Sequence, residues 1–378
     1  MLTQQQKEWA QETLDRVVRK MEKVSRRSAH KIPYTTVNGV HDDRSGEMIS
    51  WWTNGFWGGM MWQLYHLTGE ESYRRIAEES EEKLDRVLMD YDGMSHDNGF
   101  TWLPTAVADY RVTQNPASRN RGLLAAGMLA GRYNVNGNFI RAWNNWPNDS
   151  ADRTGWAIID CMMNLPLLYW AGEVAEDPRF TQIAVNHAAT TMKYFVRGDG
   201  SVNHIVAFDP CTGEYQCSYG GQGYKEGSSW TRGQSWGLYG FTLSYLHTKN
   251  VDFLRTAERI ANYFLANIPE DGLIPVDFRQ PEEVSIEDST AAAIAACGLI
   301  ELAKLEEGRQ SKVYLNAALK MLTVLAEKRC NWNEEEDNLL THCTQAYHDT
   351  QHEFSIIYGD YYFLEALLKL VEKDLFIW

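Results

Sequence analysis

An apolar run near the middle of the chain reads Ile158-Ile159-Asp160-Cys161-Met162-Met163-Asn164-Leu165-Pro166-Leu167-Leu168-Tyr169-Trp170-Ala171-Gly172-Glu173. It is long enough to form a helix of the protein core. The segment that follows it, Pro178 to Phe195, is amphipathic. An apolar helix followed by an amphipathic helix is the unit that recurs along this chain.

Similar pairs of segments occur on both sides of this run. They are Met60 to Leu67 with Glu71 to Leu88, Ser235 to His247 with Asp252 to Ala266, and Ser289 to Lys304 with Lys312 to Lys328. The second helices share an aromatic residue followed four positions later by alanine, as in Tyr73/Ala77, Phe180/Ala184, Phe253/Ala257 and Tyr314/Ala318, which places a large and a small side chain on one helix face. A less clear copy covers Gly122 to Tyr133, and Tyr361 to Val371 would pair with an N-terminal amphipathic helix within Leu2 to Arg27. The sequence therefore predicts about six helical hairpins.

Repeats of this size form either an open solenoid or a closed ring. A ring fits better, because the first helix of each pair is apolar nearly all round, as an inner wall would be, and the second has a polar outer face. We therefore expect an all-α fold, an (α/α)6 barrel, with the loops that precede the inner helices gathered at one mouth. Since no linker rich in Pro or Ser divides the chain, residues 1–378 are expected to form a single domain.

Composition excludes several classes of protein. The chain is 44% hydrophobic with a formal net charge of −15, and this charge argues against nucleic-acid binding, which depends on Lys and Arg contacts to phosphate. Residues 1–31 contain no signal-like segment, and no apolar window is long enough to cross a membrane. The six cysteines lack the short spacings of a zinc site. We expect a soluble, cytoplasmic protein.

Two aspartates are candidates for acid and base chemistry. Asp160 lies inside the apolar run, where a carboxylate must be paired, hydrogen-bonded or protonated through a raised pKa. The first two outcomes are structural and the third is catalytic, and the run alone leaves both open. Asp97 lies in a turn beside His96. If the ring brings the two aspartates together, their repulsion raises one pKa and leaves a protonated acid near neutrality.

The residues before the inner helices indicate a sugar site, because aromatic faces suit pyranose C–H surfaces while amide and guanidinium groups bind hydroxyls and carboxylates. Trp57, Trp143 and Trp236 lie beside Gly, Asn or Arg, whereas other tryptophans are expected to fill the core. Arg232 would suit a bidentate grip on a carboxylate. The alternative is a structural salt bridge with one of the 51 acidic residues. The histidines form no HExxH arrangement and no Gly-x-Ser-x-Gly motif is present, which argues against a metal site and a Ser-His-Asp triad.

Six motifs in order resemble the unsaturated glucuronyl hydrolases of glycoside hydrolase family 88, and the resemblance spans nearly the whole chain. They are Thr53-Asn54-Gly55-Phe56-Trp57, His96-Asp97-Asn98-Gly99-Phe100, Ile158-Ile159-Asp160 with Asn164-Leu165-Pro166-Leu167-Leu168, Trp230-Thr231-Arg232-Gly233-Gln234-Ser235-Trp236-Gly237, Asp288-Ser289-Thr290-Ala291 and Gly359-Asp360-Tyr361-Tyr362.

The resemblance implies an (α/α)6 barrel that needs no metal or cofactor and acts in the cytoplasm on oligosaccharides left by polysaccharide lyases. The implied substrate carries a 4,5-unsaturated uronic acid at its non-reducing end. By resemblance, Asp160 is the general acid and base and Asp97 is its carboxylate partner. The positions expected around the unsaturated ring are Trp57, His96, Trp143, His204, Gln222, Arg232 and Trp236.

Departures from the family pattern leave the preferred fragment open. Asn54 stands where some relatives have an acidic residue, and Asn333 to Phe354 matches little of the family and contains no Lys or Arg for a sulfate group. The alternatives are an unsaturated rhamnogalacturonyl hydrolase acting on pectin fragments, a sugar 2-epimerase on the same toroid with histidines as acid and base, and a non-catalytic sugar-binding protein. The sequence does not indicate an oligomeric state.

Overall fold

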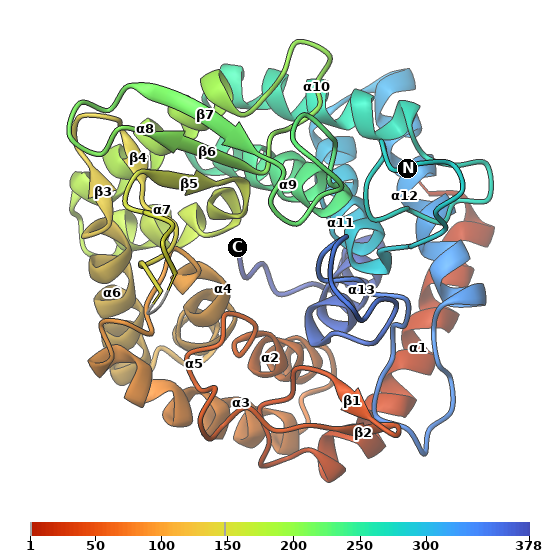
Figure 1. Ribbon diagram of the computed structural model, residues 1–378. Helices are drawn as coiled ribbons and strands as arrows, with labels where there is room; N and C mark the ends of the chain where they lie inside the picture. The colour runs from red at the N-terminus through yellow and green to blue at the C-terminus, as the bar shows by residue number, and fades with distance from the viewer. Residues whose placement is uncertain (1, 147–148) are drawn as a thin grey trace.

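The helices form a closed double ring, as Figure 1 shows for the computed structural model, which describes residues 2–146 and 149–378. Within these residues the inner ring consists of α2 (Phe56–Thr68), α4 and α5 (Asn98–Trp102 and Ala108–Thr113), α7 (Leu165–Val174), α9 (Thr231–Thr248), α11 (Ser289–Leu305) and α13 (Ile357–Leu370). The outer ring consists of α1 (Gln4–Arg27), α3 (Glu71–Leu84), α6 (Pro116–Ala130), α8 (Pro178–Tyr194), α10 (Val251–Ala266) and α12 (Gly308–Lys328). Because α13 contacts both α1 and α2, the ring closes, and the predicted (α/α)6 barrel is confirmed.

The burial of the helices follows the hydrophobic pattern that predicted them. Every residue of α13 is buried, whereas α10 buries a single face that includes Phe253 and Ala257. The aromatic and alanine positions of the outer helices face the inner ring, since Tyr73, Ala77, Tyr314 and Ala318 are also buried. Burial of apolar side chains on both sides of the inner helices holds the two rings together.

The pair formed by α4 and α5 with α6 differs from the prediction. The sequence placed Asp97 in a turn, and Asn98 begins the inner helix of this pair directly after it. Its outer partner is α6, which the expected copy at Gly122 to Tyr133 covers only in part. Pro104 interrupts the pattern, because proline has no N–H for the helix ladder, and the chain widens into a π-helical turn over Leu103–Val107.

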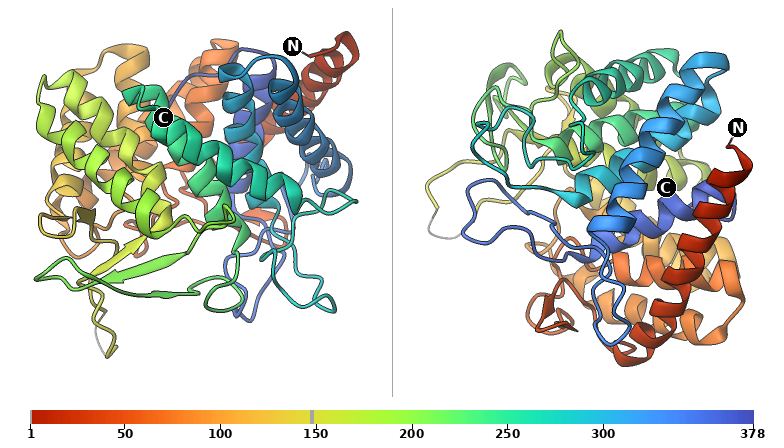
Figure 2. Two further views of the ribbon diagram at one scale, coloured as in Figure 1. Left: turned by 90° about the horizontal axis from the view of Figure 1, so that it is seen from above. Right: turned by 90° about the vertical axis from the view of Figure 1, so that its right-hand side faces the viewer.

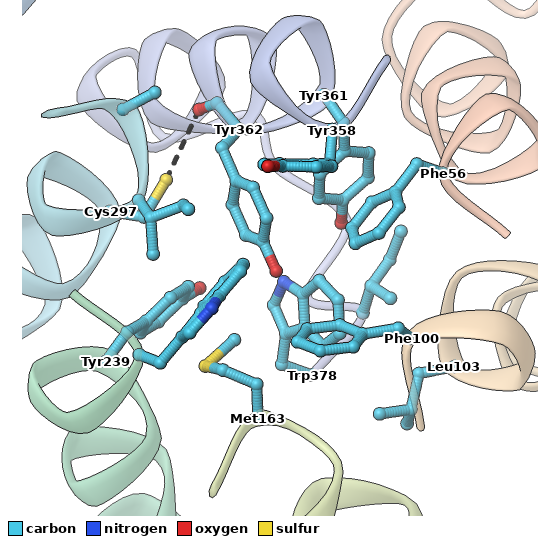
Figure 3. Close-up of a cluster of buried hydrophobic side chains, with 14 of the residues drawn as sticks. Phe56, Phe100, Leu103, Met163, Tyr239, Cys297, Tyr358, Tyr361, Tyr362 and Trp378 are labelled. Carbon is cyan, nitrogen blue, oxygen red and sulfur yellow. Dashed lines mark hydrogen bonds between the residues drawn. The ribbon is translucent and has the colours of Figure 1, made fainter. Parts of the chain in front are cut away.

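The centre of the ring is filled with aromatic side chains (Figure 3). Phe56, Phe100, Tyr239 and Tyr362 reach it from four different inner helices. The segment after α13 returns to this centre, where Trp378 is fully buried and stacks on Tyr362 with ring centroids 5.8 Å apart. The middle of the ring is therefore a packed core.

One side of the ring carries the loops and a small antiparallel sheet of three strands, β5 (Trp156–Ile158), β6 (Ile205–Phe208) and β7 (Tyr215–Tyr219), in that order (Figure 2). Two short hairpins, β1 (Thr36–Val37) with β2 (Val40–His41) and β3 (Tyr133–Asn134) with β4 (Phe139–Ile140), complete the strands of the described residues. The expectation of a purely helical chain did not include these strands. Among the described residues, no helix combines the length and the hydropathy that a bilayer crossing requires.

Candidate active site

The three-stranded sheet brings three predicted site residues to one place. β5 leads into the 3₁₀ turn Ile159–Met163, which carries Asp160, while His204 directly precedes β6 and Gln222 follows the end of β7. Because Ile158 pairs with Ile205, and Ile205 pairs with Tyr219, all three residues lie at the same end of the sheet.

His204 links Gln222 to Asp160. The backbone N–H of Gln222 donates to Nδ1 of His204 at 3.0 Å, and Nε2 of His204 lies 3.6 Å from Oδ1 of Asp160. Since Nδ1 accepts a hydrogen bond, a neutral His204 carries its proton on Nε2. This proton faces the carboxylate of Asp160.

Asp97 lies at the start of α4, where the Oγ of Ser95 donates to its Oδ2 at 3.1 Å. The Nε2 of the buried His96 is 3.4 Å from Oδ1 of Asp97. The side chain of Asp97 is 12% exposed and that of Asp160 is 14% exposed, so each carboxyl keeps only a small opening toward solvent.

Asn164 ties the turn of Asp160 to the turn of Asp97. Its Oδ1 accepts the N–H of Phe100 at 2.8 Å, and its Nδ2 donates to the carbonyl of Asp160 at 3.1 Å. The two turns approach so closely that a Cβ on Gly99 would lie 2.4 Å from Cα of Asn164. Sequence reasoning did not single out Asn164, although an amide four residues after Asp160 in an apolar run is a detectable signal.

The two carboxyls have opposite pKa shifts. Burial, together with the charge of Asp160, raises the pKa of Asp97 to about 7. Burial also acts to raise the pKa of Asp160, but His204, His96 and Arg232 outweigh it, and the pKa of Asp160 falls below its usual range. Of the two carboxyls, Asp97 therefore keeps its proton to the higher pH, and Asp160, the aspartate of the apolar run, does not. The imidazole of His96 is neutral, since burial lowers its pKa to about 3.

In this conformation the guanidinium of Arg232 donates hydrogen bonds to groups of the protein itself. Its Nη1 donates to Oδ2 of Asp288 and to the carbonyl of Thr344, both at 2.6 Å, and its Nη2 donates to the carbonyl of Gln345. The Nε2 of Gln222 donates to the carbonyl of Gln345 as well, at 3.0 Å. Arg232 thus forms the buried structural salt bridge that the sequence left open as the alternative. Its charge still acts to lower the pKa of Asp160.

The predicted tryptophans separate into two groups. Trp143 lines a cavity of about 420 Å³ that also contains Asp97, and Trp51 and Trp52 line the same cavity. Trp57 and Trp236 have no exposed surface. They pack inside the first turns of α2 and α9, where the ring of Trp57 lies 5.5 Å from that of His41 and the ring of Trp236 lies 5.0 Å from that of Phe100.

The expectation that Trp57 and Trp236 face a sugar therefore does not describe this conformation. Both positions point into the packed core, because the helices begin earlier than the hydrophobic pattern indicated, at Phe56 and Thr231. Trp51 and Trp52 line the cavity of Asp97 instead. In the sequence they stand out as two consecutive tryptophans directly before the motif that begins at Thr53.

The described residues contain no group of three or more His, Cys, Asp or Glu side chains placed to hold a metal ion. What the site does offer is a cavity lined by Asp97 and indole faces, next to a second carboxyl, Asp160, that faces the imidazole of His204. This set is suited to moving a proton onto and off a sugar ring.

Comparisons with known proteins find one family and solved structures of the same fold. The sequence profile of Glycosyl Hydrolase Family 88 matches residues 14–370. The chain is similar to the unsaturated glucuronyl hydrolase of Bacillus sp. (strain GL1), with 39% identity over 332 residues, 84% of this chain and 86% of the relative. It is 35% identical over 325 residues to the unsaturated chondroitin disaccharide hydrolase of Streptococcus pyogenes serotype M1, covering 84% of this chain and 80% of the relative. A solved structure named as an aspartate-to-asparagine variant of UGL with dGlcA-Glc-Rha-Glc matches with a TM-score of 0.88 and 33% identity, over 95% of this chain and 96% of the other.

Proposed function

The chain belongs to Glycosyl Hydrolase Family 88, and on this premise we propose that it is an unsaturated glucuronyl hydrolase. It releases the 4,5-unsaturated uronic acid from the non-reducing end of oligosaccharides that polysaccharide lyases produce. Glycosaminoglycan disaccharides are the substrate class we favour, because one relative is named for chondroitin disaccharides.

The placement of Asp97 and Asp160 on two turns that Asn164 ties together is the observation that carries the proposal. A vinyl ether needs an acid that protonates carbon and a base that deprotonates water, and two buried carboxyls whose pKa values shift in opposite directions are suited to these two roles. Non-catalytic sugar binding gives no reason to bury two such carboxyls. An epimerase with histidine acid and base is disfavoured by the neutral His96, whose pKa is about 3.

We assign proton transfer at C4 to Asp160 and storage of the shared proton to Asp97. The substrate brings its own carboxylate into the cavity, and a nearby negative charge raises the pKa of a carboxyl. Asp160 therefore takes up the proton as substrate binds. Its partner Asp97 then carries the negative charge, and the N–H of His204 stays directed at Asp160.

The chemistry follows from the C4=C5 double bond. Asp160 gives its proton to C4, and positive charge develops at C5 and on the ring oxygen. Water adds to C5 and returns a proton to the carboxylate pair. The resulting hemiketal opens, the hemiacetal left at C1 collapses, and the glycosidic partner departs as an alcohol. Water is the only co-reactant in this sequence, so we propose no metal or cofactor for it.

The remaining predicted residues position the substrate. We propose that Trp143, with Trp51 and Trp52, stacks on the sugar faces at the cavity. Gln222 and Arg232 hold the loop at Thr344 and Gln345 against the site, so that the loop forms part of the wall. We treat residues 1–378 as one catalytic domain, and we place it in the cytoplasm, since its six cysteines are free.

The experiment that tests the proposal offers unsaturated disaccharides prepared by lyases from chondroitin, hyaluronan, heparin and pectin. Cleavage removes the double bond, so the ultraviolet absorbance of the substrate decays. Decay with a glycosaminoglycan disaccharide is the expected result. Decay with the pectin fragment alone identifies a rhamnogalacturonyl hydrolase, and no decay with any substrate overturns the proposal.

A further inference from the structure

The strands that bring the site together also present a row of aromatic rings next to it. Directly paired residues of a sheet share a face, and along β5, β6 and β7 one face contains Trp156, Ile158, Ile205 and Tyr219. The opposite face carries Val206, which belongs to the main core of the ring. The face with Trp156 and Tyr219 is therefore the outer face of the sheet.

Three rings continue the cavity of Asp97 along this face. Trp143 lines the cavity, its ring centroid lies 6.4 Å from that of Trp156, and Trp156 lies 5.1 Å from Tyr219. Trp143 and Trp156 are partly exposed, and Tyr219 is 42% exposed. The guanidinium of Arg153 lies 5.4 Å from the ring centroid of Trp156 and adds a cation to the row.

Packing alone does not explain the row. The apolar cluster beneath it consists of Ala142, Ile158 and Ile205, and the two tryptophans Trp143 and Trp156 already cover it. Tyr219 lies beyond this cluster and leaves more than a third of its surface open. Of this row, the proposed function uses only Trp143, which lines the cavity, and it gives Trp156 and Tyr219 no role.

We propose that Trp156 and Tyr219 form a platform that binds the pyranose residues of longer substrates beyond the first two sugars. The inference rests on the proposed function and extends it from disaccharides to tetrasaccharides. An oligosaccharide is the expected occupant because the row of rings continues from the cavity. The chain of a bound oligosaccharide leaves the cavity past Trp143. The flat C–H faces of pyranose rings match exposed indole and phenol rings.

The platform is tested by comparing an unsulfated unsaturated tetrasaccharide with the disaccharide from the same lyase digest, using the polysaccharide that the survey above selects. For the unchanged protein, the KM for the tetrasaccharide is expected to be the lower of the two. Tyr219→Ser should raise the tetrasaccharide KM about three- to tenfold, as expected for loss of one aromatic contact. It should leave the disaccharide KM within about twofold.

Matched variants separate stacking from folding. Tyr215→Ser removes another exposed tyrosine of β7, at the end far from Gln222, where it stacks on Tyr194 with centroids 5.6 Å apart. It should change neither KM. Tyr219→Phe keeps the ring and should keep the tetrasaccharide KM close to that of the unchanged protein.

Equal KM values for Tyr219→Ser and the unchanged protein with the tetrasaccharide would overturn the platform and leave the proposed function standing. Failure of the unchanged protein to cleave either substrate would instead remove the proposed function. If Tyr219→Ser altered the molecular mass in light scattering but neither KM, the row would be an interface between two copies of the chain, and the platform would again be overturned.

Discussion

The ring buries carboxyl groups at both of its ends, and the two ends differ in the partners that these groups have. At the mouth, Oδ1 of Asp160 has no hydrogen-bond partner among the described residues. At the far end, Lys369 lies 2.8 Å from Glu301 and 3.0 Å from Asp374. Beside it, Glu365 accepts hydrogen bonds from Tyr239 at 2.6 Å and from Trp378 at 2.7 Å.

The difference separates stabilising charges from reactive ones. Burial opposes the charged form of Lys369, but Glu365, Glu301 and Asp374 outweigh it and raise its pKa, so this cluster stays ionised and fixed. At the mouth, Asp160 and Asp97 instead face the imidazoles of His204 and His96, at 3.6 and 3.4 Å, and their pKa values shift in opposite directions. A fully paired cluster holds helices together, whereas an incompletely paired one retains the capacity to exchange a proton.

The largest effect is expected for Asp160→Asn. We expect kcat to fall by about 10² to 10⁴-fold, the usual contribution of proton transfer by a side chain. The amide cannot give or take the proton, but no hydrogen bond to Oδ1 is lost, so the urea unfolding midpoint should not decrease. Turnover rates from the absorbance assay and urea titrations check both points. Normal turnover would remove Asp160 from the mechanism.

Lys369→Met tests the far end of the ring. The variant leaves Glu301 and Asp374 without their buried partner, and the expected loss is about 3–5 kcal/mol in the free energy of unfolding. Lys304→Met is the matched control, because Lys304 also bonds Glu301, at 3.0 Å, but is 44% exposed. Its cost should stay under about 1 kcal/mol. Equal losses for the two variants would contradict the distinction between buried and exposed pairs.

The pH profile tests the shared proton. Because the pKa of Asp97 is raised to about 7, the one-proton state of the free site is lost as pH rises through that value. We expect kcat/KM to fall above about pH 7, approaching tenfold per pH unit. Asp97→Asn cannot lose this proton, so the fall near neutrality should disappear from its residual activity. A profile that stays flat up to about pH 9 would argue against a titrating pair.

Arg232→Lys is expected to have the smallest effect. Lysine keeps a positive charge for Asp288 but cannot reach the carbonyls of Thr344 and Gln345 together, so the cavity wall loosens. We expect KM to rise by about tenfold, with kcat within about threefold. Arg279→Lys, at a pair with Asp199 that is more than a third exposed, should change neither constant. An unchanged KM for Arg232→Lys would show that the loop needs only the charge.

The ring was predictable because its signal is periodic. Apolar and amphipathic helices repeat, and burial follows that pattern in α9 to α13. The second inner helix, formed by α4 and α5, escaped detection because Pro104 lies in its middle, where a helix normally ends. The three strands of the mouth sheet are too short, at three to five residues, for an alternating pattern to stand out.

The site was predictable in its residue types more than in its geometry. Two carboxyls separated by about sixty residues in the chain can come together only if the ring closes, and the sequence alone left their meeting open. Which of them holds the proton depends on His204 and Arg232, which come from other parts of the chain. Burial of Trp57 and Trp236 depends in the same way on where α2 and α9 begin, and no local pattern encodes that.

Because Trp378 is buried in the centre of the ring, the ring is open only at its mouth. A polysaccharide cannot thread through it, so the chain must enter with its end first and back out by the same route. The released uronate lies deepest and the shortened oligosaccharide blocks its exit, which favours departure of the oligosaccharide first. Because only the terminal sugar carries the double bond, each substrate molecule supports one turnover, and the next turnover has to wait until the shortened chain has left and a new substrate has entered.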